Sequence, residues 1–187
     1  MEAPALAFVA DFAPTLKTIS PRFVADPRRS GGSMFRIYRD TRFSHDKTPY
    51  KTHVGLHFWH DGEGLESAPT FYLHLQPGEI FGGGGVWHPD PVTLRKIRLR
   101  IDAAPKEWKA VLAATLDIEG RSLKRVPAGF PADHPFGDDL KRTDHFASDE
   151  FTADDLACAK FVDRYADTCK RMAPLMKFLT AAVEQKR

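Results

Sequence analysis

The sequence lacks several features that would assign the chain to a familiar class of protein. It has no run of about 18 or more apolar residues, and the start Met1 to Pro4 lacks the basic and apolar regions of a secretory signal. Lys and Arg number 27 against 25 Asp and Glu, and a formal net charge of +2 does not indicate a bulk polyanion as partner. We therefore expect a cytoplasmic protein with no membrane segment, and nucleic acid is a poor candidate partner.

Cysteine is scarce, because Cys158 and Cys169 are the chain's two cysteines. If both lie on one helix, the distance between them is roughly 16 Å, which is beyond the reach of a disulfide. We expect both thiols on the apolar stripe of a C-terminal helix, where a thiol packs as a small hydrophobic group.

Familiar catalytic signatures are absent, including GxSxG, HExxH, CxxC and the protein-kinase set. His53, His57 and His60 lie near one another in the sequence, but residues four apart on a strand are separated by about 13 Å and cannot bind one ion. His57 and His74 lie on the polar faces of two predicted strands and would have to converge across the sheet. We predict no metal site and no cofactor, and the sequence names no catalytic residue.

The composition is that of an ordinary globular domain, with 42% hydrophobic and 28% charged residues. Residues 1–187 match the usual size of one domain. Side-chain character alternates with period two in residues 35–40, 53–59, 70–76 and about 79–87. Because the later connections are too short for parallel crossovers, we predict one antiparallel sheet. Helices should pack on the face that carries Val54, Leu56, Leu73 and Leu75.

Helical periodicity appears on both sides of this predicted sheet. Residues 4–19 have it, although Pro14 is expected to interrupt the helix. Asp90 before Pro91 is a strong helix start. The carboxylate can accept hydrogen bonds from the unpaired backbone N–H groups of the first turn, and proline at the first helical position costs no helical hydrogen bond. Pro105 opens a second short helix.

The last quarter of the chain contains a long predicted helix, which follows a polar, Pro-rich connection at residues 120–148. Thr152 and Asp155 fit a capping box at its start, and Pro174 should kink or divide it. The predicted fold class is therefore α+β: a single antiparallel sheet of about four strands, with helices packed on one face and a long C-terminal helix.

The most unusual stretch is RDTRFSHDKTPYK, residues 39–51, which joins two predicted strands and contains four cations and two carboxylates. In the simplest interpretation it is a salt-bridged surface connection, where exposed pairs contribute little to stability. In the functional interpretation its cations donate to a carboxylate or phosphate, while Asp40 and Asp46 hold them in place. The donors would be Arg42, Lys47 and Lys51.

A second unusual stretch, Phe81 to Pro89, contains four consecutive glycines directly before the helix start at Asp90. Glycine-rich turns before helices can cradle phosphate. Here Asp90 already occupies the cap and would repel an anion, and the stretch matches neither common nucleotide-binding pattern. Close backbone approach or a bulge is the favoured use of these glycines.

Several motifs, in this order along the chain, resemble the bacterial family known as domain of unknown function twenty-four sixty-one. They are RDTRFSHDKTPYK, FYLHLQPGE, GGGVWHP, PVTLRKIRLRI and KRVPAGF, and the likeness covers about residues 5–182. The resemblance places the family's signature at Arg39, Asp40, Arg42, Phe43, Asp46, Lys47, Pro49, Tyr50, Lys51, Gly85, Trp87 and Pro89. It implies no reaction, because the family has no agreed activity.

Two departures from the family accompany this resemblance. Members usually begin with another helical segment, so we expect this chain to lack it and to self-associate or lose stability as a result. Ala128 stands where the family tends to have a basic residue, which weakens any binding role for the turn PAGF.

The leading functional hypothesis is a site on the sheet for a small anionic metabolite, with or without catalysis, built from the charged loop. The candidate binding residues are Arg39, Asp40, Arg42, Asp46, Lys47, Tyr50, Lys51 and Trp87. The competing hypothesis is a non-catalytic module whose same charged loop contacts a protein partner. Whether the chain is an enzyme, and whether it forms a homo-oligomer, stays open at this point.

Overall fold

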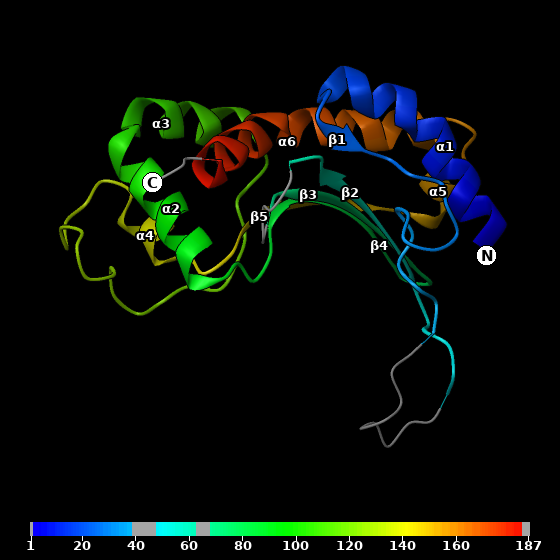
Figure 1. The fold of residues 1–187 in the computed structure, drawn as a ribbon, viewed down its shortest axis with the longest axis horizontal. Coiled ribbons are helices and arrows are strands. Elements are labelled where there is room, and N and C mark those ends of the chain that lie inside the picture. Colours follow the sequence, from blue (N-terminus) through cyan, green and yellow to red (C-terminus); the bar gives the residue numbers. More distant parts are fainter. Residues whose placement is uncertain (1, 39–47, 63–67, 185–187) are drawn as a thin grey trace.

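A curved antiparallel sheet lies at the centre of the computed structural model, which describes residues 2–38, 48–62 and 68–184 (Figure 1). Its five strands follow one another in sequential order and every neighbouring pair is antiparallel. The strands are β1 (Phe23–Val24), β2 (Val54–His60), β3 (Thr70–Gln76), β4 (Glu79–Val86) and β5 (His145–Phe151). The predicted α+β class and antiparallel sheet are confirmed.

The strand predicted at residues 35–40 is wrong for the part of it that the structure describes. Nearby, Met34 and Tyr38 form only isolated bridges, to Leu56 and Tyr50, outside the named strands. The adjacent side chains of Phe35 and Arg36 are both exposed. Side-chain character alternates in this segment, but neither face is buried against the core, so nothing fixes the register of a strand there.

The fifth strand and a short helix, α4 (Gly137–Lys141), fall within residues 120–148, where we predicted only a connection. The helix-facing side of β5 alternates polar and apolar residues: His145, Ala147, Asp149 and Phe151. The hydrophobic alternation is therefore interrupted, which hid the strand from a pattern search.

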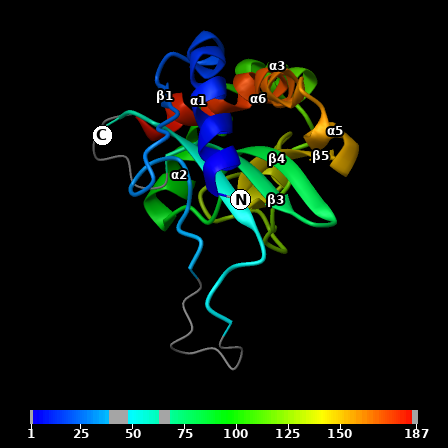
Figure 2. The same cartoon turned by 90° about the vertical axis from the view of Figure 1, so that its right-hand side faces the viewer.

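Helices cover one face of the sheet. The helices are α1 (Glu2–Ile19), α2 (Pro91–Ala103), α3 (Pro105–Ala114), α4, α5 (Ala153–Ala157) and α6 (Phe161–Val183). α1 and α6 pack on the sheet, and α2, α3 and α5 pack on α6. Figures 1 and 2 show α1, α6 and α3 on the same side of the arched sheet, while the concave side carries no helix over β3 and β4. The segments on either side of residues 39–47 extend from this open side.

The predicted helix starts are confirmed in chemical detail. The Asp90 side chain accepts hydrogen bonds from the backbone N–H groups of Val92 and Thr93, and Pro91 is the first residue of α2. Thr152 and Asp155 form the predicted capping box.

Three details of the helices differ from prediction. The helix that Thr152 caps is the short α5, and the long C-terminal helix α6 begins only at Phe161. Pro14 and Pro174 lie inside α1 and α6, and both helices continue through them. Packing of α1 and α6 on the sheet maintains these helices although each proline removes one backbone donor.

The core lies between the sheet and the helical layer. The rings of Phe12 on α1, Phe58 on β2 and Tyr165 on α6 meet there, with ring centroids 4.9 to 5.9 Å apart. Cys169 is buried in this layer as expected. Cys158 ends α5 and is exposed, so its predicted place on the apolar stripe is wrong.

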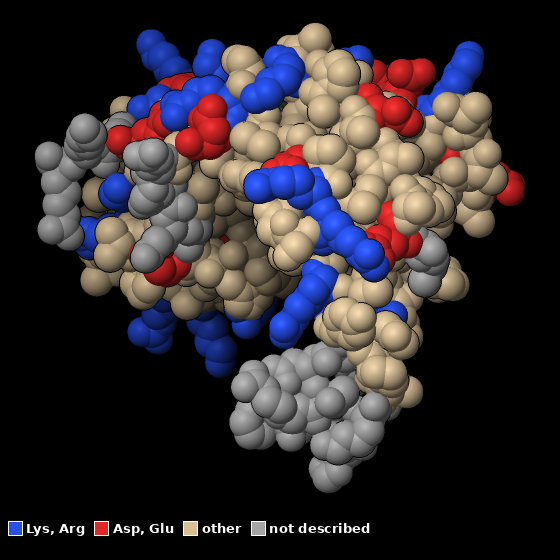
Figure 3. Space-filling model, turned by 45° about the vertical axis from the view of Figure 1, so that its right-hand side comes forward, with Lys and Arg blue, Asp and Glu red and all other residues tan. Residues whose placement is uncertain are grey.

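The hydropathy of the described helices and the charge on the face seen in Figure 3 bear on membrane and polyanion binding. Within the described part of the chain, no helix combines the length and the apolar character needed to cross a membrane. In Figure 3, Lys and Arg alternate with Asp and Glu over the helical layer at the top of the view. The viewed face therefore offers no continuous basic surface of the kind that binds a polyanion.

Candidate functional site

The open face of the sheet carries a groove of about 500 Å³ that crosses β3, β4 and β5. Alternation along the strands produces it. On β3, Phe71 and Leu73 point into the helical core and are fully buried, so Thr70, Tyr72 and His74 point to the opposite face. A hollow of this size, lined mainly by apolar and aromatic side chains, is typical of small-molecule sites.

Four consecutive glycines of β4 serve both faces of the sheet. A Cβ atom on Gly82 would lie 2.8 Å from the Tyr165 ring, and one on Gly84 would lie 3.2 Å from the sulfurs of Met172 and Met176. These two glycines let α6 approach the strand closely. Gly83, Gly84 and Gly85 line the groove. Gly85 also lets β5 approach closely, because a Cβ atom there would lie 2.2 Å from the carbonyl oxygen of His145. The predicted close approach by the glycines is confirmed.

Aromatic rings form two walls around this glycine floor. One wall contains Tyr72 and Phe81, whose ring centroids are 5.9 Å apart, and His74, which stacks on Phe81 at 4.9 Å. The other wall contains Trp87 and Phe146, whose centroids are 4.9 Å apart. Trp87 is 66% exposed, an unusual position for so large an apolar ring. Aromatic rings therefore border the glycine floor in two places.

The polar groups of the groove are few and are held in place. Tyr72 Oη lies 3.1 Å from Nδ1 of His74, and Nε2 of His57 donates to the carbonyl of Gly32 at 3.3 Å. Burial raises the pKa of Tyr72, and the charge of Glu79 acts in the same direction. Tyr72 therefore remains a hydroxyl that can donate a hydrogen bond at neutral pH.

Burial also disfavours charge on two histidines near the groove. It lowers the pKa of His57, against a smaller opposing effect from the hydrogen bond to Gly32. Burial lowers the pKa of His53 as well, and the neighbouring His74 and Lys51 act in the same direction. Both imidazoles are neutral at pH 7 and present flat aromatic faces.

Three of the eight residues predicted to bind a ligand lie in the described part of the chain. Trp87 lines the groove. Lys51 does not line the groove, but its charge acts on His53, whose ring stacks on the groove residue His74 at 4.8 Å. Tyr50 is exposed and packs on Tyr38, outside the groove lining. Five predicted residues lie outside the described residues: Arg39, Asp40, Arg42, Asp46 and Lys47.

The histidines do not form a metal site in the described structure. His57 and His74 share the open face, as expected, but His57 stacks on Phe35 at 4.4 Å while His74 stacks on Phe81. His60 is buried beside Phe23 on the other side of the sheet. No group of three His, Cys, Asp or Glu side chains among the described residues could hold an ion.

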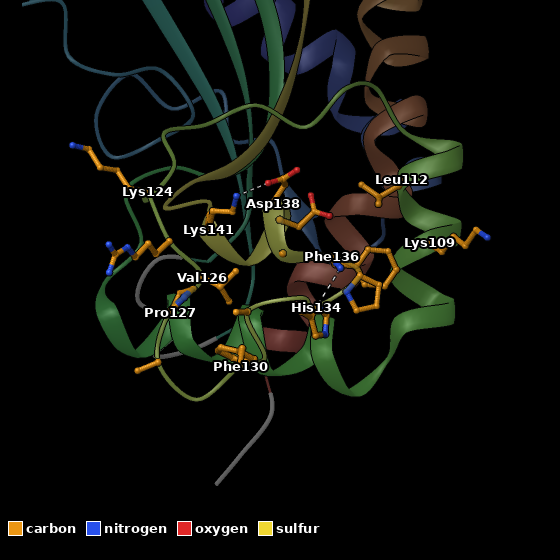
Figure 4. Close-up of a pocket in the computed structure, with 16 residues that line it drawn as sticks. Lys109, Leu112, Lys124, Val126, Pro127, Phe130, His134, Phe136, Asp138 and Lys141 are labelled. Atoms are coloured by element: carbon orange, nitrogen blue, oxygen red, sulfur yellow. Dashed lines mark hydrogen bonds and ion pairs between the residues drawn. The ribbon is translucent and has the colours of Figure 1, made fainter.

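A second hollow, of about 1050 Å³, lies between α3 and residues 124–141 (Figure 4). Lys141 pairs with Asp138 at 2.6 Å in its wall. Lys109 and Lys124 point outward on opposite sides of the hollow in Figure 4. The lining contains several Lys and Arg residues, but Lys109 and Lys124 do not converge on one point (Figure 4), so the hollow is poorly suited to bind a specific anion.

Comparison with known families now identifies the chain's relatives. The model of the conserved hypothetical protein family DUF2461 matches residues 1–178. The chain belongs to this family. No curated protein matches the sequence. The DUF2461 description names no activity, so function has to be argued from the groove itself.

Sequence reasoning missed part of the groove. Phe81 and Phe146 face it from β4 and β5, and Phe146 lay in the stretch assigned to a connection. The polar-face residues Tyr72 and His74 were a usable signal, because aromatic side chains on the exposed face of a strand have no packing reason to be there. The position of Phe146 beside Gly85 follows from the pairing of β5 with β4, which the sequence pattern did not reveal.

Proposed function

We propose that this DUF2461 protein binds a small organic molecule that combines a flat ring with an anionic group, in the groove on the open face of the sheet. The observation that carries the proposal is the pair of aromatic walls, Tyr72 with Phe81 and Trp87 with Phe146, on either side of a floor of glycines. Such rings bind flat ligands through dispersion and stacking.

The anionic group is assigned from the signature segment. The charge of Lys51 acts on His53, which stacks on His74 at one end of the groove, and the segment that precedes Lys51 contains Arg39, Arg42 and Lys47. Glu79 also lines this end and disfavours an anion directly beside it. The ligand's anionic group therefore belongs on the Lys51 side, where cations outnumber carboxylates in residues 39–51.

A molecule of this kind is a small metabolite. Such metabolites occur in the cytoplasm, the location expected from the sequence. The mixture of both signs of charge on the face seen in Figure 3 favours such a ligand over a nucleic-acid polymer. Binding through a preformed, aromatic-lined groove also favours a small molecule over a protein partner at the same segment.

The test uses anilinonaphthalene sulfonate (ANS), a fluorescent probe with fused rings and one sulfonate. We expect saturable binding with one site per chain and a change in Trp fluorescence, because Trp87 lines the groove. The uncharged N-phenylnaphthylamine and the ringless methanesulfonate should both bind more weakly. Near-UV circular dichroism should show native packing throughout, since ANS also binds partly unfolded chains.

Two matched variants locate the probe. Thr70 lines the groove and pairs with Gly85, so Thr70→Phe should fill the floor and abolish saturable binding. Leu99→Phe adds the same ring at an exposed position of α2 and should bind ANS as the parent does. Equal binding by parent and Thr70→Phe would refute the groove as the site and would favour the protein-contact interpretation of the charged segment.

A further inference from the structure

We propose that His88 is a general acid–base residue at the Trp87 end of the groove, positioned by the buried carboxylate of Asp144. The inference rests on the proposed function, because it assigns chemistry to the same groove. The observation behind it is an exposed imidazole, beside a groove-lining ring, with a buried carboxylate next to its Nδ1.

Asp144 is firmly held and charged. Its side chain is buried, since the residue is 2% exposed. Oδ1 accepts a hydrogen bond from the backbone N–H of His88 at 2.8 Å. Oδ2 accepts hydrogen bonds from the Thr143 hydroxyl at 3.1 Å and from the backbone N–H of Arg121 at 3.3 Å. Burial by itself raises the pKa of Asp144, but these hydrogen bonds outweigh it and the pKa lies below its ordinary value. Asp144 is therefore a carboxylate at neutral pH.

The His88 ring combines a carboxylate neighbour with exposure to solvent. Its Nδ1 lies 3.5 Å from Oδ1 of Asp144, and 49% of its side chain is exposed. A carboxylate next to Nδ1 favours the tautomer that has its proton there, which leaves Nε2 as a free acceptor. This is the role an orienting carboxylate has in known acid–base catalysts.

The backbone of His88 is also unusual. Its φ is +48°, and it is the one non-glycine residue with positive φ among the described residues. Histidine adopts this region less readily than glycine, and such strain persists only where other contacts hold it. The hydrogen bond from the His88 N–H to Asp144 is such a contact. The same carboxylate thus holds the backbone and lies next to the ring.

Two other described histidines have a ring nitrogen within 4.0 Å of a carboxylate oxygen, and neither has this arrangement. The side chain of His134 is 8% exposed, its Nε2 faces the half-exposed Asp102 at 3.3 Å, and its Nδ1 accepts the N–H of Phe136. The side chain of His60 is 1% exposed, and Nδ1 accepts the N–H of Gly62. In both the imidazole is buried and the carboxylate is in solvent, the reverse of His88 and Asp144.

The His88 ring lies beside the groove. Its centroid is 4.8 Å from that of Trp87, and Trp87 in turn packs on Phe146 at 4.9 Å. Trp87 and Phe146 both line the groove. A ligand that stacks on Trp87 would therefore lie close to the His88 ring, although His88 itself does not line the groove.

The chemistry that fits is proton transfer to and from the bound ligand. An acidic C–H or O–H of the ligand gives its proton to Nε2, the electron pair stays on the ligand atom, and Asp144 stabilises the imidazolium that forms. Return of the proton restores the neutral imidazole, so the step needs no co-reactant. Covalent catalysis is less suited, because the groove hydroxyl of Ser148 donates to Glu119 at 2.5 Å and Cys169 is buried in the core.

The first test measures the tautomer of His88 by nitrogen NMR on the parent protein. We expect the Nδ1–H form in the parent and a shift toward the Nε2–H form in Asp144→Asn. His88→Asn assigns the signal and keeps the backbone, since Asn tolerates positive φ. An Nε2–H tautomer in the parent overturns the positioning role of Asp144, whether or not the Asp144 variant folds.

The second test asks whether the groove and His88 form one site. Diethyl pyrocarbonate modifies exposed imidazoles, and mass spectrometry gives the rate at each histidine. With ANS present at about ten times its dissociation constant, the modification of His88 should slow about tenfold by occupancy alone. The matched control is Thr70→Phe, in which ANS should not protect His88.

The outcomes separate the two proposals. If ANS binds at the groove but leaves the rate at His88 unchanged, the groove function stands and the acid–base assignment is wrong. If ANS does not bind at the groove, the proposed function fails by itself, and the tautomer measurement still reports on His88 and Asp144. Protection of His88 together with the Nδ1–H tautomer supports the assignment.

Discussion

Gly82 of β4 and Tyr165 of α6 meet at the interface between sheet and helix, where a Cβ atom on Gly82 would lie 2.8 Å from the Tyr165 ring. The Phe151 ring would be 3.0 Å from the same atom, so the site is closed on two sides. Tyr165 is fully buried and has little room to move. The distance between strand and helix is therefore set by the absence of a side chain at residue 82.

Gly82→Ala should destabilise the protein, because the added methyl group overpacks the interface. We expect a loss of about 1 to 3 kcal/mol in the free energy of unfolding, measured by urea titration. The control is Gly137→Ala, where the nearest atom to a new Cβ is Val126 Cγ2 at 3.4 Å, an ordinary contact. Equal stability of Gly82→Ala and parent would show that α6 can shift to accommodate the methyl group.

The sequence predicted the parts of the fold in which hydrophobic alternation and helix capping agree with tertiary packing. Strands β2, β3 and β4 have one consistently apolar face, and Asp90 and Thr152 have the chemistry of helix caps. β5 was missed because His145 and Asp149 occupy helix-facing positions, where they are accommodated by tertiary contacts rather than by hydrophobicity.

The groove could be predicted only in part. Trp87 and the exposed aromatic face of β3 were visible in the pattern, but the pairing of Gly85 with Phe146 depends on a register between segments about 60 residues apart. The relationship of His88 to Asp144 has the same origin, since 56 positions separate them in the chain. Local patterns contain no information about such contacts.

Stability should fall as the pH is lowered below neutral, because His145 resists protonation in the folded state. Burial is the largest cause of its lowered pKa, about 4, and the charges of Arg142 and Arg98 act in the same direction. In the unfolded chain the pKa is near 6.5, so between the two values the unfolded state binds more protons and is stabilised relative to the folded state as the pH falls. The full effect of His145 is roughly 3 kcal/mol.

The measurement is the free energy of unfolding between pH 7 and pH 4.5, in the parent and in His145→Leu. The variant should show a smaller pH dependence, because it has no proton to bind at this position. Burial also lowers the pKa of His53, His57 and His60, so some dependence in the same direction will remain. An unchanged slope in His145→Leu would show that His145 is protonated as readily in the folded state as in the unfolded chain.

The buried hydrogen bond from Trp108 Nε1 to Asp139 Oδ2, at 3.0 Å, should be important for the docking of α3. Trp108→Phe keeps most of the ring but leaves this carboxylate oxygen without its donor. We expect a loss of about 1 to 3 kcal/mol in the free energy of unfolding. Asp139→Asn retains an acceptor oxygen and should cost less. If the two variants are equally destabilised, the lost ring volume or the lost charge matters more than the hydrogen bond.

The last prediction concerns Arg42 and Lys47 of the signature segment, which the proposed function assigns to the anionic group. Replacing either by Ala should weaken ANS binding more than tenfold, since a charge-assisted hydrogen bond contributes about 1.5 to 3 kcal/mol. Binding of the uncharged N-phenylnaphthylamine should not change. Lys109→Ala, an exposed cation on α3 that does not line the groove, is the matched control and should bind both probes as the parent does.

Stability separates the remaining alternatives for these two cations. Surface ion pairs contribute less than about 1 kcal/mol, so both variants should unfold at nearly the parent's urea concentration. Folded variants that bind ANS like the parent would refute the assignment of the anion to this segment, and the ring-binding groove would stand alone. Variants that lose several kcal/mol of stability would instead show that Arg42 and Lys47 are structural charges, and their loss of binding would then carry no information about the ligand.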